Sequence, residues 1–217
     1  MSIVIVGAGP NLGAAVARRF GREGMSVGLV SRSAAKLEEL ANVLNEEGIT
    51  ADFAAADIRD AEALSTAIRS LADRLGPVEV LEYSPLPAKE FMKPIRETTV
   101  DDLRGPLEFS VLGAVAAALA VAEPMVEAGS GSVLFTTGGA AIRPYPERTG
   151  VGVSFAGEVA YARMLHEALA EKGVHVGHTA ISGRIAPGAD HEPDDVAEVL
   201  WRHHTDKADF QVLIGFD

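Results

Sequence analysis

Short apolar runs alternate with longer amphipathic segments along the whole chain, and this alternation constrains the fold more than any other feature. The runs are bounded by glycine, proline or polar residues, which is typical of strands. Seven of them occur, at Ile3–Val6, Val27–Val30, Ala51–Ala56, Val78–Glu82, Ser132–Thr136, Val174–Ala180 and Phe210–Ile214. Apolar strands that alternate with amphipathic helices indicate a parallel sheet covered on both faces. The sequence therefore predicts an α/β fold, a doubly wound parallel sheet of seven strands with helices on both faces.

The segments between these runs have helical periodicity, and several of them end at glycine or proline. Helices are expected at Leu12–Gly24, Ala34–Glu47, Ala61–Leu75, Pro106–Ala128, Ser154–Lys172 and Pro193–Arg202. A loop rich in proline and charge, Pro85–Thr99, precedes the longest of them. Because the chain has no internal repeat, no low-complexity linker and no second composition regime, residues 1–217 are expected to form a single domain.

Charge and cysteine content exclude several classes of protein. The formal net charge is −12 and no Lys/Arg-rich run occurs, so nucleic acid is not an expected partner. The chain has no cysteine, which excludes disulfides and cysteine metal sites and is compatible with a cytoplasmic protein. The apolar stretch Val111–Ala122 is too short to span a bilayer and is flanked by Glu108 and Glu123, so we expect a buried core helix. Neither a signal peptide nor a membrane association is expected.

A glycine-rich segment, Gly7-Ala8-Gly9-Pro10-Asn11-Leu12-Gly13, joins the first strand to the first helix. Small residues at this point let the backbone turn tightly and approach a pyrophosphate, and the helix N-terminus supplies N–H donors. The position of the motif, after a strand and before a helix, is typical of a Rossmann-type dinucleotide site. The alternative is a tight turn without a ligand.

The second strand ends at Ser31 and Arg32, where an acidic residue would favour NAD through the ribose hydroxyls. A guanidinium instead suits a 2′-phosphate, because it can form two charge-assisted hydrogen bonds. Arg32 therefore indicates NADP, with NAD less favoured. The alternative interpretation is an ordinary solvated arginine at the end of the strand.

These features together resemble the short-chain dehydrogenase/reductase family. The family's Gly-x-x-x-Gly-x-Gly pattern is matched at Gly7 and Gly13, with Asn11 in place of the middle glycine. The resemblance implies that Asp57 bonds the adenine amino group and that Ile58 packs on the ring. The alternative for Asp57 is that it starts the turn into the next helix, which Asp60 could cap equally well.

The same resemblance locates the family's four catalytic positions. The tyrosine and lysine positions fall on Val151 and Phe155, the serine position on Gly138, and the asparagine position on Ser110. None of the four can perform its family role, since Val151 and Phe155 have no proton to transfer and no charge. The family's Asn-Asn-Ala-Gly after the fourth strand reads Tyr83-Ser84-Pro85-Leu86, which leaves Ser84 as a cofactor-binding candidate. The catalytic residues are therefore unknown.

The chain has three tyrosines that could substitute for the missing acid. Tyr161 lies about 15 Å along the helix from the family position, so an aromatic packing contact is expected. Tyr145, between Pro144 and Pro146, suits a rigid surface turn. Tyr83 is expected near the nicotinamide end of the crevice, with a phenol that stays near its normal high pKa because it has no basic neighbour.

The six histidines form no metal-ligand set in the sequence. His203 and His204 are adjacent on a helix and point in different directions, and His175 and His178 lack an acidic partner at metal spacing. Satisfied or solvated imidazoles are expected at every histidine, and no metal site is expected. A serine hydrolase is excluded because no serine lies in a Gly-x-Ser-x-Gly elbow.

Two hypotheses follow, with a third less favoured. The first is an atypical NADP(H)-dependent oxidoreductase acting on a small carbonyl or alcohol substrate, since hydride transfer needs only aligned reactants. The second is a non-catalytic nucleotide-binding pseudoenzyme, a sensor or partner subunit; the third is an enzyme using the cleft for a different reaction. The resemblance also implies a homodimer or homotetramer built by pairing helices Pro106–Ala128 and Ser154–Lys172.

Overall fold

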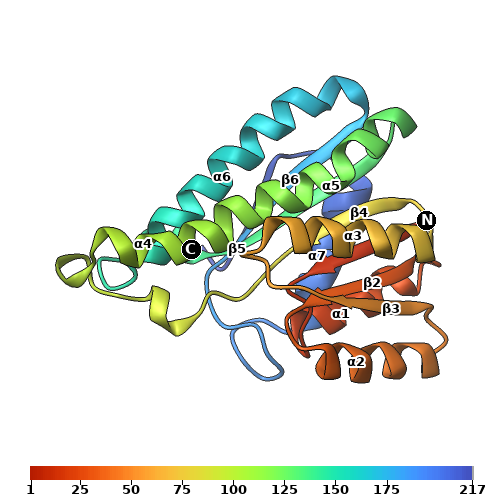
Figure 1. The fold of residues 1–217 in the computed structure, drawn as a ribbon, viewed down its shortest axis with the longest axis horizontal. Coiled ribbons are helices and arrows are strands. Elements are labelled where there is room, and N and C mark those ends of the chain that lie inside the picture. Colours follow the sequence, from red (N-terminus) through yellow and green to blue (C-terminus); the bar gives the residue numbers. More distant parts are fainter. Residues whose placement is uncertain (217) are drawn as a thin grey trace.

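The computed structural model describes residues 1–216 and contains one seven-stranded, fully parallel sheet (Figure 1). The strands are β1 (Ser2–Val6), β2 (Ser26–Ser31), β3 (Ala51–Ala55), β4 (Val78–Tyr83), β5 (Gly131–Gly138), β6 (Val174–Ile181) and β7 (Gln211–Ile214). Their order in the sheet is β3-β2-β1-β4-β5-β6-β7. The order reverses between β1 and β4, and in sheets of this type ligands bind in the crevice at that point. The predicted seven strands and doubly wound sheet are confirmed.

Helices cover both faces of the sheet, and each face has its own apolar cluster. They are α1 (Leu12–Gly21), α2 (Ala34–Glu46), α3 (Ala61–Leu75), α4 (Val100–Leu107), α5 (Gly113–Ala128), α6 (Thr149–Leu169) and α7 (Pro193–Asp206). Figure 1 shows α3, α5 and α6 side by side across one face. The opposite face is covered by α1, α2 and α7, with Phe20, Leu37 and Leu200 in its core.

Two long helices begin earlier than the sequence indicated. The helix expected from Pro106 starts at Val100, because Thr99 and Asp102 form a capping box there. A π-helical turn, Glu108–Leu112, then interrupts the run. The helix expected from Ser154 starts at Thr149, although its first turn is glycine-rich. Tertiary packing explains this start, since a Cβ on Gly150 would lie 2.7 Å from the Phe91 carbonyl oxygen.

The apolar segment around α5 is a core helix, as expected. The continuous helical run Val100–Ala128 is long and apolar enough to cross a membrane by composition, but 56% of its most apolar window is buried inside the domain. Most of the small side chains of α5 are fully buried, including Ala114, Ala117 and Ala118. This helix therefore covers the sheet.

Candidate cofactor site

The glycine loop turns at the carboxyl end of β1, beside the point where the strand order reverses. Gly7 has φ +94°, and a Cβ there would lie 2.5 Å from the Pro85 Cα atom. At Gly13 a Cβ would lie 2.9 Å from the Ala8 Cα atom, so this glycine permits close packing of α1 on the loop. Asn11 has φ −95° and ψ −101°, so it lies outside the left-handed region that favours glycine.

The amino end of α1 is left open toward the crevice. Asn11 occupies the N-cap position without a side-chain capping bond, and no acidic residue lies in the first turn. Nearby, Gly9 faces open space, since a Cβ on it would meet nothing closer than the Gly7 carbonyl oxygen at 3.9 Å. Uncapped N–H groups at a helix N-terminus favour an anion. The loop from Gly9 to Leu12 thus has the shape and the donors to hold a phosphate group.

A pocket of about 140 Å³ adjoins this loop and brings together residues from five segments. Its lining includes Gly7, Ser31, Arg32, Ile58, Leu86 and Phe109. The first four are residues that the sequence singled out for dinucleotide binding. Arg32 is exposed, and no hydrogen bond or ion pair holds its guanidinium among the residues described. The geometry thus offers an apolar slot next to an available cation.

Asp57 and Asp60 have different partners. Asp60 caps α3 by accepting a hydrogen bond from the Ala63 amide at 3.0 Å. Asp57 pairs with Arg59 at 3.1 Å, and this hydrogen-bonded pair lowers the pKa of Asp57, with a smaller contribution from Arg32. Asp57 is therefore ionised at neutral pH and is not the cap of the helix. Its role toward adenine stays a prediction.

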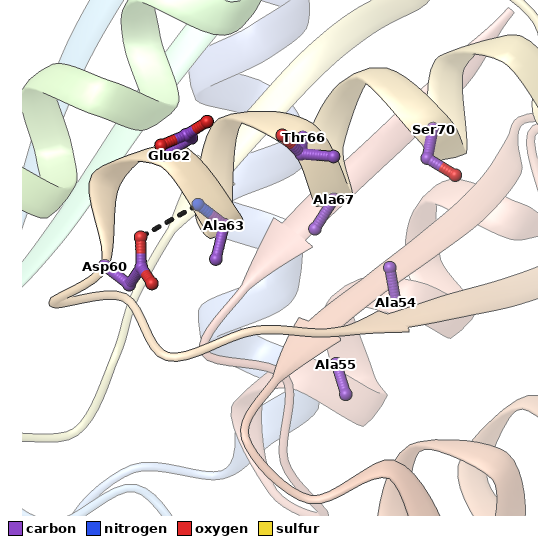
Figure 2. A pocket seen from close by; sticks show the side chains of 8 residues that line it. All are labelled: Ala54, Ala55, Asp60, Glu62, Ala63, Thr66, Ala67 and Ser70. Atoms are coloured by element: carbon purple, nitrogen blue, oxygen red, sulfur yellow. Dashed lines mark hydrogen bonds between the residues drawn. The ribbon is translucent and has the colours of Figure 1, made fainter.

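A larger pocket of about 470 Å³ lies away from this region, between β3 and α3 (Figure 2). Its lining is small and acidic: Ala54, Ala55, Asp60, Glu62, Ala63, Thr66, Ala67 and Ser70. None of these residues belongs to the predicted cofactor set, and Asp60 is committed to capping α3, as Figure 2 shows. We therefore place the candidate site at the smaller pocket, where the strand order reverses.

At the other end of the crevice, the four positions derived from the family pattern are mostly apolar and buried. Val151 and Phe155 lie one turn apart in α6 and are 5% and 4% exposed. Gly138 ends β5, and a Cβ on it would lie 3.5 Å from the Phe155 ring. Ser110 is buried in the π-helical turn. The fold therefore brings Gly138 and Phe155 together without supplying an acid or a base.

Tyr83 lies elsewhere than the sequence suggested. Its ring is fully buried on the α3/α5 face, and its hydroxyl donates to the carbonyl oxygen of Phe109, in the π-helical turn. Burial raises the pKa of Tyr83 well above its usual range, and the charge of Glu158 acts in the same direction. The expectation that the phenol keeps its normal pKa was therefore wrong, because nothing in the sequence indicated this burial; the hydroxyl stabilises the core and is not a crevice group. Gly113 makes room for it, since a Cβ there would lie 2.5 Å from the Tyr83 hydroxyl.

The other two tyrosines behave as expected. Tyr161 packs edge-on against Phe135 with ring centroids 6.2 Å apart. Tyr145 is largely exposed in the turn between its two prolines. Tyr161 is thus a packing residue and Tyr145 a surface-turn residue.

Two buried carboxyl groups lie near the crevice, and the sequence did not single them out. Glu82 in β4 is fully buried, accepts hydrogen bonds from Ser84 and Thr136 at 2.7 and 3.1 Å, and burial raises its pKa to about 7. Glu158 in α6 is 2% exposed, and its Oε1 has no hydrogen-bond partner among the described residues. Burial raises the pKa of Glu158 well above its usual range, against the opposing effect of the Ser110 hydroxyl.

A sequence signal existed for both carboxyl groups. Glu82 interrupts an otherwise apolar end of the fourth strand, in a sheet already expected to be covered on both faces. Glu158 follows Val151 and Phe155 at helical spacing, on the face that packs inward. A carboxyl at such a position is rare without a partner, and that rarity is the signal.

The histidines are buried more deeply than expected. His178 bonds Thr137 and Gln211, and His204 bonds Ser132. His203 and His204 have different partners, as their adjacency on a helix implied. The expectation that every imidazole is satisfied or solvated was wrong for His175, whose buried Nε2 has no partner. No group of three or more metal-ligating side chains occurs within residues 1–216.

The sheet order, the glycine loop and the pocket at the reversal point define a Rossmann-type domain. The sequence matches the short chain dehydrogenase family over residues 1–189. The chain therefore belongs to the short-chain dehydrogenase family.

Relatives of known name are oxidoreductases of this family. The chain is 27% identical to 2,3-dihydro-2,3-dihydroxybenzoate dehydrogenase of Bacillus subtilis over 172 residues, which cover 78% of this chain and 64% of that protein. It is 26% identical to D-threitol dehydrogenase of Mycolicibacterium smegmatis over 174 residues, 80% of this chain and 66% of that one. The matched segment thus spans just under two thirds of each relative.

Solved structures match over the whole length. A short-chain dehydrogenase from Rhodopseudomonas palustris superposes with a TM-score of 0.88 at 25% identity, over 100% of this chain and 98% of that one. L-sorbose reductase from Gluconobacter frateurii, solved with NADPH and L-sorbose, has the same fold, with a TM-score of 0.87 at 19% identity over 100% and 95% of the two chains.

Proposed function

We propose that this protein binds NADP(H) and is an atypical oxidoreductase of the short-chain family, without the Asn-Ser-Tyr-Lys catalytic set. The observation that supports the proposal most strongly is the pocket at the reversal point, lined by Gly7, Ser31, Arg32 and Ile58. A cytoplasmic location accords with the absence of cysteine.

The adenine and phosphate half of the crevice fits a dinucleotide. Gly9 and Leu12 would face the pyrophosphate, because the open N-terminus of α1 favours an anion. Arg32 and Ser31 would hold a 2′-phosphate, and Ile58 would pack on the adenine ring. When bound, the nicotinamide would supply or accept a hydride.

The nicotinamide half is apolar where the family places its proton-transfer residues. Val151 and Phe155 can exclude water and shape the floor, but they cannot hold or move a proton. A substrate or water must therefore manage the proton if the protein turns over. The same observation favours a second candidate function, a non-catalytic nucleotide-binding subunit.

Titration with NADPH followed by a carbonyl-substrate panel separates the two candidates. Saturable binding with substrate-dependent NADPH oxidation would support the oxidoreductase. Saturable binding without turnover on any substrate would support the non-catalytic subunit. The absence of any NADPH binding would contradict both.

Replacing Arg32 by alanine is expected to weaken NADPH binding by about 10- to 100-fold and NADH binding by less than about threefold. The reason is the loss of charge-assisted hydrogen bonds to the 2′-phosphate, which NADH lacks. Fluorescence titration of both cofactors measures the ratio. Arg22→Ala, which removes an exposed arginine at the far end of α1, is the matched control. Equal losses for the two cofactors would refute the assignment of Arg32.

We also propose that two copies pair through α5 and α6. These helices and the π-helical turn before α5 expose apolar side chains on the side away from the sheet: Leu112 in the turn, Leu119 in α5, and Val153 and Met164 in α6. Leu112 and Leu119 are seven residues apart, so they lie on one stripe of the helical run. Small residues such as Ala156 and Ala160 lie between the larger ones on α6 and permit close helix approach.

Leu119→Glu is expected to convert the dimer to a monomer, because it places a charge in the centre of the apolar stripe. Light scattering coupled to size-exclusion chromatography measures the mass. Val43→Glu, on the exposed side of α2, adds the same charge on the opposite face and should leave the mass unchanged. A wild-type monomer, or a Leu119→Glu dimer, would contradict the pairing.

A further inference from the structure

A buried carboxyl group lies near the glycine loop and is connected to it through a single hydroxyl group. Glu82 is fully buried near the carboxyl end of β4, and its Oε2 accepts a hydrogen bond from the Ser84 hydroxyl at 2.7 Å. Its other oxygen accepts from Thr136 at 3.1 Å. No ion pair among the described residues involves Glu82, so its charge has hydroxyl partners but no cation.

Ser84 connects this carboxyl to the loop that would hold the phosphates. Its amide donates to the Val6 carbonyl oxygen at 3.0 Å, immediately before the loop. Gly7 packs against the same backbone, since a Cβ on Gly7 would lie 2.9 Å from the Ser84 carbonyl carbon. Ser84 is half-buried and directly precedes Pro85, which lines the pocket, so its hydroxyl links the edge of the pocket to the buried carboxyl.

A negative charge at Glu82 and an anionic dinucleotide on the glycine loop repel each other. The repulsion acts partly through the protein interior, where charges are screened less than in water. Binding an anion next to a carboxyl therefore favours the protonated form of that carboxyl. Protonation removes the repulsion and keeps the hydrogen-bonding partners in place.

We propose that Glu82 is a proton-binding site coupled to the cofactor site, taking up a proton from solvent when NADPH binds beside Ser84. The inference rests on the proposed function, since it requires the dinucleotide to bind at the glycine loop. Burial raises the pKa of Glu82 to about 7, so the ionised form is present at the start of binding near neutral pH. In this role Glu82 does not touch the cofactor and acts on its binding through Ser84, so it is a positioning residue and not a catalytic one.

Glu82 is the group in its surroundings that changes protonation near neutral pH, because its ionisable neighbours do not titrate there. β1 and β5, which flank β4, contain no ionisable side chain, and Glu82 lies on the face of the sheet that α1 and α7 cover, in register with Ile5 and Leu134. The charged side chains of these two helices are paired or exposed: Arg18 with Glu47, Arg19 with Glu198, and Asp194 and Asp195 at the surface. Burial lowers the pKa of His203 and His204 of α7, which bond Thr179 and Ser132, so both are neutral near pH 7. Glu158 is coupled to Glu82 by charge, but burial without a full set of partners holds it in the neutral form. Tyr83 is also neutral over this range because burial raises its pKa.

Isothermal titration of the full chain with NADPH, in buffers of different ionisation enthalpy, counts the protons exchanged. Between pH 7 and 8.5 we expect net uptake of about half a proton or more per site, and a three- to tenfold loss of affinity as pH rises. Glu82→Gln should abolish the uptake and bind more tightly than wild type at pH 8.5. Because the cofactor's own phosphate also exchanges protons, the difference between wild type and Glu82→Gln is the quantity that decides.

Two further measurements guard against a purely structural effect. Ser84→Ala removes a hydrogen bond to the carboxylate and should move the uptake to higher pH without abolishing it. The infrared carboxylic-acid band that NADPH induces in wild type should be missing in Glu82→Gln. Glu79→Gln, which removes a carboxyl from the opposite end of β4, should keep the wild-type uptake.

Binding of NADPH with the same proton exchange in wild type and Glu82→Gln would overturn the proposal while leaving the proposed function intact. An absence of NADPH binding by wild type would overturn the proposed function itself, and the proton coupling with it. The two failures are therefore distinguishable in one titration series.

Discussion

Acidification from pH 7.5 to pH 5 is expected to cost the folded state about 6 kcal/mol through three buried histidines, about 2 kcal/mol each. The pKa values of His175, His178 and His204 are lowered to about 4, in each case mainly by desolvation. In the unfolded chain a histidine takes up its proton near pH 6.5. The contribution is therefore present above pH 6.5 and is lost as pH falls from there toward 4.

Glu82 changes the unfolding free energy with pH in the direction opposite to the histidines. Its pKa is raised to about 7 by burial, so it destabilises the folded state at high pH and ceases to do so as pH falls from 7 toward its unfolded value. Glu158 has the same sign. The unfolding free energy of wild type should therefore change less with pH than the sum of the three histidine contributions. Single variants are needed to isolate each histidine.

His204→Asn and His178→Gln are designed to keep one hydrogen bond while removing the titration. Asparagine can still bond Ser132, and glutamine can still bond Thr137. Each variant should reduce the stability lost between pH 7.5 and 5 by about 2 kcal/mol in urea denaturation. The double variant should be additive, because Ser132 and Thr137 project from opposite faces of β5. Profiles that match wild type in both variants would contradict the histidine account.

Gly7→Ala is expected to destabilise the fold by about 3 kcal/mol or more and to reduce NADPH binding at least about 100-fold. Alanine at φ +94° is strained, and its Cβ would lie 2.5 and 2.7 Å from the Pro85 Cα and N atoms. Both atoms belong to backbone, so a side-chain rotation cannot relieve the clash. The loop must move, and the anion-binding turn moves with it.

Gly24→Ala supplies the matched control for this substitution. Gly24 has φ +88°, but a Cβ there meets nothing within 4 Å, so the variant measures backbone strain alone, about 1 kcal/mol. The difference in unfolding free energy between the two variants isolates the contact with Pro85. If Gly7→Ala loses no more stability than Gly24→Ala, the close packing of the loop on Pro85 is not essential.

Local features of the sequence were enough to predict the elements, but not their ends. The strand at Ala51–Ala55 and the helix at Ala61–Leu75 appear nearly as expected, because periodicity and the Asp60 cap are local signals. The early start of α6 has no such local signal, since its first turn is glycine-rich and Phe91 and Pro106, distant in sequence, leave no room for a side chain at Gly150. The start of α4 at Val100 was also missed, although its signal, the Thr99–Asp102 capping box, is local.

The sequence alone determined the parallel sheet and the glycine loop at its reversal point. Strand and helix periodicity depend on neighbouring residues, and the glycine loop needs small residues at fixed spacing. The sheet and the loop can therefore both be predicted from the sequence. Only the tertiary structure decided the environment of the ionisable groups. It buries Glu82, Glu158 and His175, and it places the Tyr83 side chain in the core. The physical reason is that desolvation depends on every group that surrounds a side chain, and most of those groups are distant in sequence.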